Sequence, residues 1–580
     1  MQTEADVDLY RFALEEPGRA RISLTGGQAA NAYALSLASA IDARALQTAQ
    51  AGGEAELEEI YLDAGEYILQ VAPGEAWTAE PYTFRVEYTE DALVERERND
   101  APDVATPIAE NTSMTGRFNS LADVDYYAFA LEQSMQVLLQ LDFPAQEGNR
   151  EGLALTLYAG DTPVFSANAL ESQSQIHLPQ LVLPAGQYRL CIENRRMAAA
   201  GYVLRLETSI PEGAALEAEP NDAPGTATAA PLNAPVLGAL LPRANGEDID
   251  TYAFTLEEPG AAVLGFSFAP PLGECATGSY YILTLADESR SAIYSETISA
   301  ANGMETVDYA SPTVYLDAGT YYVQVAQGRN AWAGGYTLRL DHEARADAEG
   351  ERNDTPETAT PVSPGTPIRG GFLHSADVDW FRLDLDAPSV IQLQFAFTPL
   401  EENERTYTLT LTDGKQEYLQ AHVRGRESNF VSTPVCLPAG TYYVCLENPY
   451  FVRQEYALTV VCAAAEAVEA EPNDALAEAT PLLQGRAYSG ICSSRQDTDT
   501  YLLTVSPGDA PSLSFAFDPF GGEEAAYTLR LEQNGRVLWD TQVSAASGGL
   551  NAAIQLPEGE YYLSVTPEDW TAAVYTISVS

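Results

Sequence analysis

Two acidic motifs recur along this chain at nearly fixed spacing, and the rest of the sequence repeats with them. The first motif has the form Glu-x-Glu-x-Asn-Asp, and the second has the form Asp-x-Asp. The first Glu precedes the first Asp by 28 residues in three copies and by 31 in the other. Internal repetition of this kind is typical of a chain built from similar units. The motif residues are Glu95, Glu97, Asn99, Asp100, Asp123 and Asp125; Glu217, Glu219, Asn221, Asp222, Asp248 and Asp250; Glu349, Glu351, Asn353, Asp354, Asp377 and Asp379; and Glu469, Glu471, Asn473, Asp474, Asp497 and Asp499.

A second marker, Leu-x-x-Gly-x-Tyr, occurs five times and sets the size of the repeat. Its glycines are Gly65, Gly186, Gly319, Gly440 and Gly559. Their spacing predicts five units of about 120 residues, an ordinary domain size. We predict domains at residues 1–90, 95–210, 217–343, 349–463 and 469–580. The first has an Asp pair, Asp6 and Asp8, without the preceding linker and leading strand. It is therefore predicted to be truncated, and the given chain to be a fragment of a longer protein.

The repeats are expected to be all-β. Short apolar runs lie between turn-rich polar stretches, and several alternate apolar and polar residues with the period of a half-buried strand. In the second repeat the predicted strands cover residues 127–131, 137–141, 153–157, 181–183, 188–192 and 202–206. Strands that recur roughly every 8–12 residues favour a sandwich or jelly roll. The predicted fold is a tandem array of five β-sandwich, jelly-roll-like domains.

The Leu-x-x-Gly-x-Tyr marker is interpreted as a tight turn between two strands. Its glycine is predicted to adopt a positive φ, which carries no Cβ penalty. Its tyrosine is predicted to bond back to nearby backbone, as in a tyrosine corner. The Ala-Thr-Pro patch after the first acidic motif predicts extended chain, because proline disfavours helix.

The Asp pairs share the parity of the apolar residues in the strand that follows, as in Asp123, Asp125, Tyr127, Phe129 and Leu131. Alternate strand residues lie on one face, so both carboxylates are expected to point toward the core margin. Two like charges there lose hydration and repel each other, and they need protons, arginines or a metal. The two motifs together offer about five or six oxygen-bearing side chains, as a hard cation requires. We therefore predict a calcium site in each of the four complete repeats.

The alternative interpretation is structural. Asn-Asp would cap a turn, and Asp-x-Asp would be a solvated entry to a strand. That interpretation does not explain why the Glu pair and the Asp pair reappear together in four repeats.

Composition limits the partners. The chain has 84 acidic and 30 basic residues, for a net charge of −54. Such a surface repels nucleic acid and anionic membranes, and it suits a cation-rich environment or serves solubility alone. No apolar run is long enough for a transmembrane helix, and the chain begins without a signal-peptide pattern. Cys191 and Cys445 are expected to be buried free thiols, whereas Cys436, Cys462 and Cys492 are left open as possible disulfide partners.

A large side chain recurs before the last strand of each repeat, as Trp77, Met197, Trp332, Phe451 and Trp570. A packing plug beneath a loop is favoured over an exposed sugar- or peptide-binding aromatic, because methionine substitutes at one position. None of the four histidines recurs, and zinc-protease and serine-hydrolase motifs are absent from the sequence. We therefore predict no enzyme activity.

Taken together, these motifs resemble the bacterial pre-peptidase C-terminal domain family. The resemblance rests on both acidic motifs, the Leu-x-x-Gly-x-Tyr marker and a closing Tyr-x-Leu strand, and it covers nearly all of the chain as five tandem copies. It implies β-sandwiches attached to secreted proteases and other exported proteins. Relatives that include the collagen-binding domains of clostridial collagenases bind calcium through linker acids and a following Asp pair. By resemblance, the motif residues named above would be ligands in the second to fifth repeats, while the first has only Asp6 and Asp8.

The expected function is a non-catalytic calcium-binding array, extracellular or on a bacterial cell surface, that acts as a spacer or adhesion segment. An upstream catalytic domain in a longer parent chain is a further expectation. The alternative is a set of ligand-binding modules for matrix protein or polysaccharide, attached to a secreted protease or other hydrolase.

Overall fold

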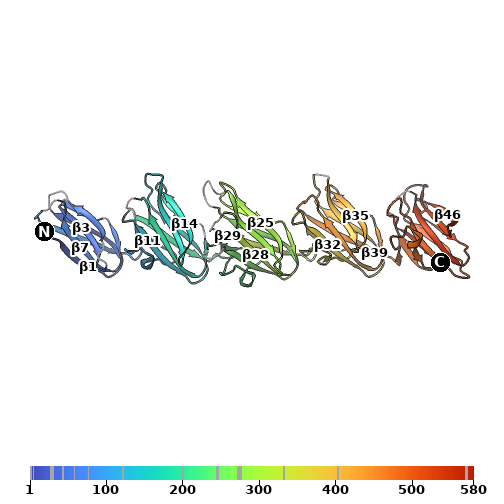
Figure 1. The fold of residues 1–580 in the computed structure, drawn as a ribbon, viewed down its shortest axis with the longest axis horizontal. Helices are drawn as coiled ribbons and strands as arrows, with labels where there is room; N and C mark the ends of the chain where they lie inside the picture. Colours follow the sequence, from blue (N-terminus) through green and yellow to red (C-terminus); the bar gives the residue numbers. More distant parts are fainter. Residues whose placement is uncertain are drawn as a thin grey trace. The chain divides into compact units, whose positions relative to one another are not determined.

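The protein is described by a computed structural model of residues 3, 5–26, 32–41, 45–51, 53–57, 59–75, 78–120, 123–178, 181–197, 201–242, 247–270, 277–330, 334–401, 404–568 and 573–580. These residues form strands and three single-turn 3-10 helices, with no α-helix among them (Figure 1). The short helices are η1 (Pro102–Val104), η2 (Pro224–Thr226) and η3 (Leu476–Glu478). The prediction of an all-β chain is confirmed.

Residues 1–90 form two sheets. The first has the order β1 (Asp8–Leu14), β7 (Gly65–Pro73), β3 (Tyr33–Ser39) and β4 (Ala45–Ala51). The second has the order β5 (Gly53–Glu56), β2 (Gly18–Gly26) and β6 (Ile60–Leu62), with β8 (Tyr82–Glu90) also paired to β2. Among the described residues no strand pairs with the other edge of β8, as expected for a repeat without a leading strand.

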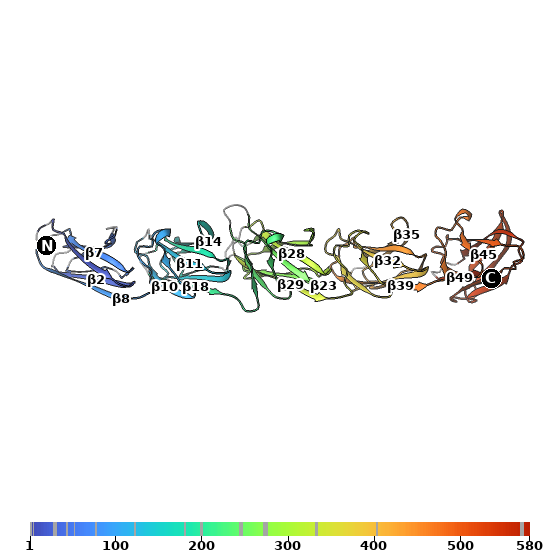
Figure 2. The ribbon, with the colours of Figure 1, turned by 90° about the horizontal axis from the view of Figure 1, so that it is seen from below.

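The second repeat has a leading strand of its own, β10, whereas the first repeat has no equivalent strand among its described residues. One sheet has the order β10 (Thr112–Arg117), β18 (Gly201–Ser209), β12 (Met135–Asp142) and β15 (Gln175–His177), with β16 (Leu181–Leu183) also on β12. Figure 2 shows β10 beside β18. The other sheet has the order β14 (Thr162–Leu170), β13 (Glu151–Ala159), β17 (Gly186–Asn194), β11 (Val124–Leu131) and β9 (Thr106–Pro107). All six strands predicted for this repeat are present.

The third and fourth repeats follow the same order. In the third, the sheets are β19 (Ala215–Leu216), β21 (Val236–Ala239), β29 (Gly335–Ala344), β23 (Gly260–Phe268) and β26 (Val307–Ala310), with β27 (Val314–Leu316) on β23; and β20 (Thr228–Ala229), β22 (Ile249–Leu256), β28 (Gly319–Gln327), β24 (Gly278–Ala286) and β25 (Ala292–Ala300). In the fourth, they are β31 (Ile368–Gly371), β39 (Glu455–Ala464), β33 (Ser389–Phe397) and β36 (Asn429–Val431), with β37 (Val435–Leu437) on β33; and β30 (Thr360–Pro361), β32 (Val378–Leu385), β38 (Gly440–Glu447), β34 (Arg405–Thr412) and β35 (Glu417–Arg424).

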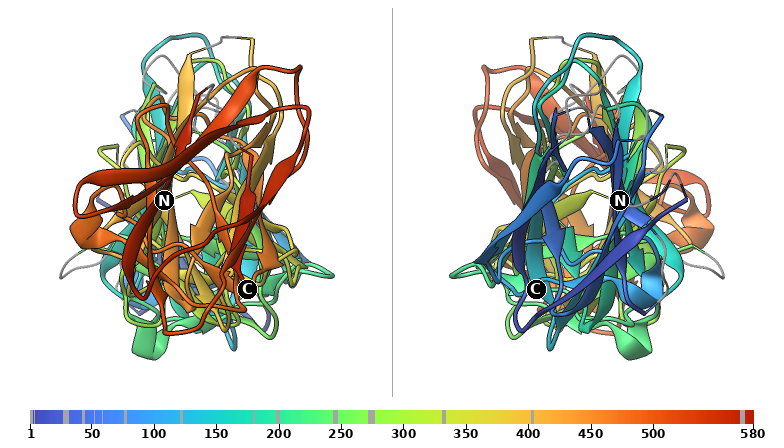
Figure 3. Two further views of the ribbon diagram at one scale, coloured as in Figure 1. Left: turned by 90° about the vertical axis from the view of Figure 1, so that its right-hand side faces the viewer. Right: turned by 90° about the vertical axis from the view of Figure 1, so that its left-hand side faces the viewer.

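The fifth repeat also has two sheets, and Figure 3 (left) shows its red strands in two layers. One has the order β40 (Ala467–Val468), β42 (Ala487–Gly490), β49 (Tyr575–Val579), β44 (Ser512–Phe517) and β47 (Gly549–Ala553). The other has the order β41 (Thr480–Leu482), β43 (Asp499–Val505), β48 (Gly559–Pro567), β45 (Ala525–Gln533) and β46 (Arg536–Ser544).

The long ladders of these sheets are antiparallel. Parallel pairs are only two or three residues long, and in each complete repeat one joins the Ala-Thr patch to the strand that carries the Asp pair. The two sheets of a repeat share one apolar cluster, as when Leu139 and Leu141 of β12 join Leu155 and Leu157 of β13. The Asp-bearing strand therefore runs along one wall of an apolar interior.

The predicted fold, a tandem array of five independent β-sandwich, jelly-roll-like domains, is corrected by the contacts along the chain. These divide the described residues into two units, one of residues 1–255, 264–310 and 320–341 and the other of residues 256–263, 311–319 and 342–580. The physical reason is that the predicted linkers are not free connections. Between the first two repeats, Glu97 bridges to Leu62 on one side, and Val94 bridges to Thr115 on the other. A linker paired on both sides continues the packing instead of interrupting it.

The Leu-x-x-Gly-x-Tyr turns confirm the tyrosine corner and correct the glycine. Tyr67, Tyr188, Tyr442 and Tyr561 each donate a hydroxyl hydrogen bond of 2.7–3.0 Å to the carbonyl four residues earlier. Of the five marker glycines only Gly559 has a positive φ. The glycine begins the next strand, so its backbone is already extended, and the turn lies before it.

The recurrent large residues and the thiols are buried or half-buried where the structure describes them. Met197 is 1 % exposed within the apolar core of the second repeat, and Phe451 packs against the apolar core of the fourth repeat, so both are packing plugs. Trp77, Trp332 and Trp570 lie outside the described residues. The described cysteines form no disulfide with one another, and Cys191 and Cys445 are buried as predicted.

Candidate metal centres

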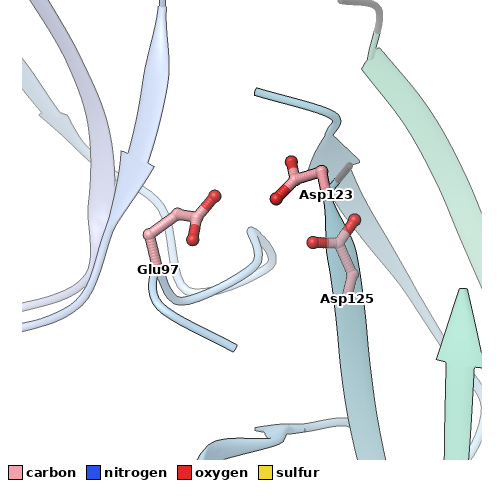
Figure 4. A group of neighbouring side chains, drawn as sticks. All are labelled: Glu97, Asp123 and Asp125. Atoms are coloured by element: carbon pink, nitrogen blue, oxygen red, sulfur yellow. The ribbon is translucent and has the colours of Figure 1, made fainter. Parts of the chain in front are cut away.

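The two acidic motifs meet in each of the four complete repeats. The linker places its glutamates against the start of the Asp-bearing strand, and Figure 4 shows the carboxylates of Glu97, Asp123 and Asp125 facing one another. In each cluster the three residues offer ligand atoms that all lie within 4.8 Å of one another. The clusters are Glu97, Asp123 and Asp125; Glu219, Asp248 and Asp250; Glu349, Glu351 and Asp379; and Glu469, Glu471 and Asp499.

The aspartates of the clusters are buried, as the strand parity predicts, whereas the cluster glutamates Glu219 and Glu471 are partly accessible. Asp125 and the equivalent Asp250, Asp379 and Asp499 are 0 % exposed. The first glutamates of the linkers, Glu95, Glu217, Glu349 and Glu469, are at most 1 % exposed. Carboxylates this deep lose their hydration and require a compensating partner.

Backbone amides fix the first glutamate in the same way in each of the four complete repeats. Its Oε1 accepts a hydrogen bond of 2.7–3.0 Å from the amide 22 residues later, given by Arg117, Ala239, Gly371 or Ile491. The first Asp of each pair accepts an amide from the same turn, as Leu241 gives to Asp248 at 2.6 Å. The linker itself is held by a threonine hydroxyl, which accepts the amide between the two glutamates, as Thr106 accepts that of Arg96 at 3.0 Å.

A tyrosine from the last long strand of each complete repeat contacts the second Asp of the pair, and sequence reasoning missed this role. Tyr202, Tyr336, Tyr456 and Tyr575 each donate a hydroxyl hydrogen bond to Oδ2 of the second Asp. The sequence shows the closing Tyr-x-Leu strand, but the aspartate that accepts the hydroxyl hydrogen bond lies 76–86 residues earlier in the chain. Tyr202 lies in β18 of one sheet and Asp125 in β11 of the other, so only the packing of the two sheets shows which residue the hydroxyl reaches.

Several buried oxygens of the clusters have no hydrogen-bond partner. They include Oδ1 of the second Asp in all four repeats and Oδ1 of the linker asparagine in all four, Asn99, Asn221, Asn353 and Asn473. Each of these asparagines is 0 % exposed. A buried oxygen without a donor costs about 1–3 kcal/mol. The same orphaned pair in four repeats fits a cation, because a metal ion accepts oxygen lone pairs that no donor satisfies.

Burial and mutual repulsion shift the ionisation of the clusters. Burial raises the pKa of Asp499 to about 7 and the pKa values of Glu349 and Glu471 to about 8. The pKa of Asp379 is held well above its usual range by burial, then by the charges of Glu349 and Asp377. A bound divalent cation reverses this effect by stabilising the ionised form.

Some of the predicted ligands are not members of the clusters, among them the last Asp of each Glu-x-Glu-x-Asn-Asp motif. Asp100, Asp222 and Asp474 are exposed, and Asp354 is half-buried and pairs with Arg352 at 3.3 Å. The remaining predicted residues, such as Glu95 and Asp377, are buried beside the clusters. In the first repeat Asp8 accepts a hydrogen bond from Tyr82, but its described residues contain no metal-type cluster.

None of the helices among the described residues is long and apolar enough to cross a membrane.

Comparison with known proteins gives no family. No family model and no curated protein matches the chain. Among solved structures it is similar to the pre-peptidase C-terminal domain of a collagenase from Bacillus anthracis, at 18% identity and a TM-score of 0.16, covering 19% of this chain and 100% of that one. It is also similar to the CUB1-EGF-CUB2 region of human MASP-1/3, at 10% identity and a TM-score of 0.14, covering 37% of this chain and 98% of that one.

Proposed function

We propose that this chain is a non-catalytic calcium-binding repeat protein that acts outside the cell as a spacer or adhesion segment. The observation that carries the proposal is the buried carboxylate and amide oxygens that recur without hydrogen donors in four repeats.

The ligand chemistry favours calcium. The clusters consist of Asp and Glu alone, with an asparagine oxygen beside them, so they offer oxygen and neither nitrogen nor sulfur. Calcium takes 6–8 oxygens in flexible geometry, whereas magnesium demands a near-ideal octahedron and keeps several waters. Carboxylates, amide oxygens and a few waters together supply the larger shell.

Ion binding would act on the linker. Glu97 or its equivalent comes from the linker, whereas Asp123 and Asp125 belong to the entry of β11. One ion held by both ties the linker to the strand and removes the repulsion between their charges. The linker then becomes a stiff part of the repeat, as a spacer requires.

The test is thermal unfolding of the whole chain with calcium, with magnesium and with a chelator, combined with calorimetric titration. We expect calcium to raise the melting temperature, the chelator to reverse the rise, and about four ions to bind, one for each cluster. An unchanged melting temperature with no heat of binding would rule the proposal out.

The site assignment is tested in the fourth repeat. Replacing Glu349 and Asp377 together by alanine should remove one of the four binding events. The matched control replaces Asp386 and Glu401, two exposed acids of the same repeat, and should leave all four. Loss of binding in the control as well would show that bulk charge holds the ions.

A further inference from the structure

One short strand in each of the first four repeats buries a residue that is expected to face solvent. This strand has three residues and precedes the Leu-x-x-Gly-x-Tyr turn, as β6, β16, β27 and β37. Alternate residues of a strand share a face, so its first and third residues point toward the core and its middle residue points away. The middle residues are Tyr61, Val182, Tyr315 and Cys436, and all are at most 5 % exposed.

The fifth repeat provides an internal contrast. Its residues before the turn are Ile554, Gln555 and Leu556. Ile554 is buried and Leu556 packs against the fifth core cluster, so the inward residues are the same in kind. The middle residue Gln555 is polar and exposed. The strand itself therefore does not require an apolar middle residue. In the other four repeats, the middle residue is buried by another part of the chain.

The cover is the linker and metal-centre wall of the following repeat. The carbonyl of Tyr315 accepts a hydrogen bond of 3.0 Å from the amide of Glu351, which belongs to the acidic cluster of the fourth repeat. The ring of Tyr315 lies beside Gly371, where an added Cβ would be 3.8 Å from it. Gly371 is the residue whose amide holds Glu349.

The next junction repeats the arrangement with different residues. Cys436 packs in one apolar cluster with Val468 and Ile491 of the fifth repeat. The amide of Ile491 holds Glu469, as that of Gly371 holds Glu349. Cys436 also lines one cavity together with Glu469 and Glu471. At both junctions the middle residue touches the amide-bearing segment that anchors the first glutamate.

We propose that these middle residues are docking residues that close the metal centre of the following repeat. This inference rests on the proposed metal binding and adds that each centre is shared between two consecutive repeats. An apolar wall keeps water from the carboxylates and strengthens their attraction to a cation. Without the ion, the same wall confines repelling charges. Docking and metal binding therefore stabilise each other by the same factor.

The first experiment needs no metal. In the whole chain, Cys436→Gln introduces the residue found at the equivalent place in the fifth repeat. Hydrogen exchange in chelator should become about tenfold or more faster at the amides of Glu469 and Ile491, because undocking frees the segment that carries them. Gln555→Ala is the matched control and should change neither. Unchanged exchange in the Cys436 variant would overturn the docking role.

The second experiment measures coupling to the ion. Calorimetric titration of the Cys436→Gln chain should show one site of the four weakened by about tenfold, within the usual range of coupling between sites. Four sites of unchanged affinity would overturn the shared centre and leave the proposed calcium binding intact. Absence of binding to the unaltered chain would instead refute the proposed function, while the exchange result would still judge docking. Val182→Gln provides an independent variant, with the weakened site expected in the third repeat.

Discussion

At the scale of single residues, the metal centres depend on hydrogen bonds that the chain makes to its own carboxylates. Tyr202 donates to Asp125 at 2.6 Å and lies 2.8 Å from the hydroxyl of Tyr127. In the fourth repeat phenylalanine, Phe381, stands where the others have the second tyrosine, and Tyr456 still donates to Asp379 at 2.6 Å. The two tyrosines are therefore unequal, since only one is always present.

We predict that Tyr202→Phe lowers the stability of the calcium-loaded protein by about 1–3 kcal/mol, because it leaves a buried carboxylate oxygen without its donor. Tyr127→Phe should have a much smaller effect, because the fourth repeat is built without that hydroxyl. Thermal unfolding in calcium compares the two. Equal losses would contradict the assignment of Tyr202 as the donor.

The sequence predicts the acids better than their partners. The parity of Asp125 with Tyr127 and Phe129 correctly places the carboxylate inward, because alternation along one strand is a local property. The same reasoning fails for Asp100, because a residue in irregular chain has no fixed parity. Tyr202 could not be assigned, since its hydroxyl reaches Asp125 through a packing contact 77 residues away.

At the scale of elements, close approach between a strand and the first glutamate leaves no room for a side chain. A Cβ on Gly370 would lie 2.3 Å from Oε2 of Glu349. A Cβ on the neighbouring Gly371 would meet nothing nearer than 3.5 Å. The two glycines of β31 therefore differ in what they permit, although the sequence alone shows only a pair.

Gly370→Ala is expected to displace Glu349 and to remove or strongly weaken the ion site of the fourth repeat. Destabilisation of about 1–3 kcal/mol is typical of overpacking at such a position. Gly371→Ala should keep the site, since it preserves the amide that holds Glu349. Titration with calcium distinguishes them, and four intact sites in the Gly370 variant would contradict the steric argument.

The strands that the sequence predicts are those with a local apolar pattern, whereas a strand without such a pattern is not predicted. All six strands named for the second repeat exist, and several of them alternate apolar and polar residues. The leading strand β10 (Thr112–Arg117), in contrast, is polar along most of its length and was not predicted. Its position beside β18 follows from backbone pairing with a strand of the same sheet, which no local pattern records.

At the scale of the whole molecule, the net charge of −54 includes four buried acidic clusters, and we expect these to make stability depend on both pH and calcium. In the unfolded chain Asp and Glu ionise near pH 4, whereas burial raises the folded pKa of Asp499 to about 7 and that of Glu471 to about 8. A raised folded pKa contributes stability that is present below about pH 4 and lost as pH rises toward the folded value.

In chelator, the protein should therefore melt at a higher temperature at pH 5 than at pH 8. In excess calcium the order should reverse, because the ion requires ionised carboxylates and loses its hold as pH falls through the raised pKa values. Melting curves at the two pH values under both conditions check this. A chelated protein that is more stable at pH 8 would contradict the buried, uncompensated state of the clusters.

The hydrogen bond from each closing tyrosine to its Asp also has an optical consequence. A phenol held against a metal ligand is placed to pass its excitation to a lanthanide ion that replaces calcium. Each of the four centres has its own such tyrosine, Tyr202, Tyr336, Tyr456 or Tyr575. Each of these tyrosines is thus a candidate sensitiser of terbium emission at its own site. Replacing them by phenylalanine one at a time would lower the sensitised emission of a chosen repeat.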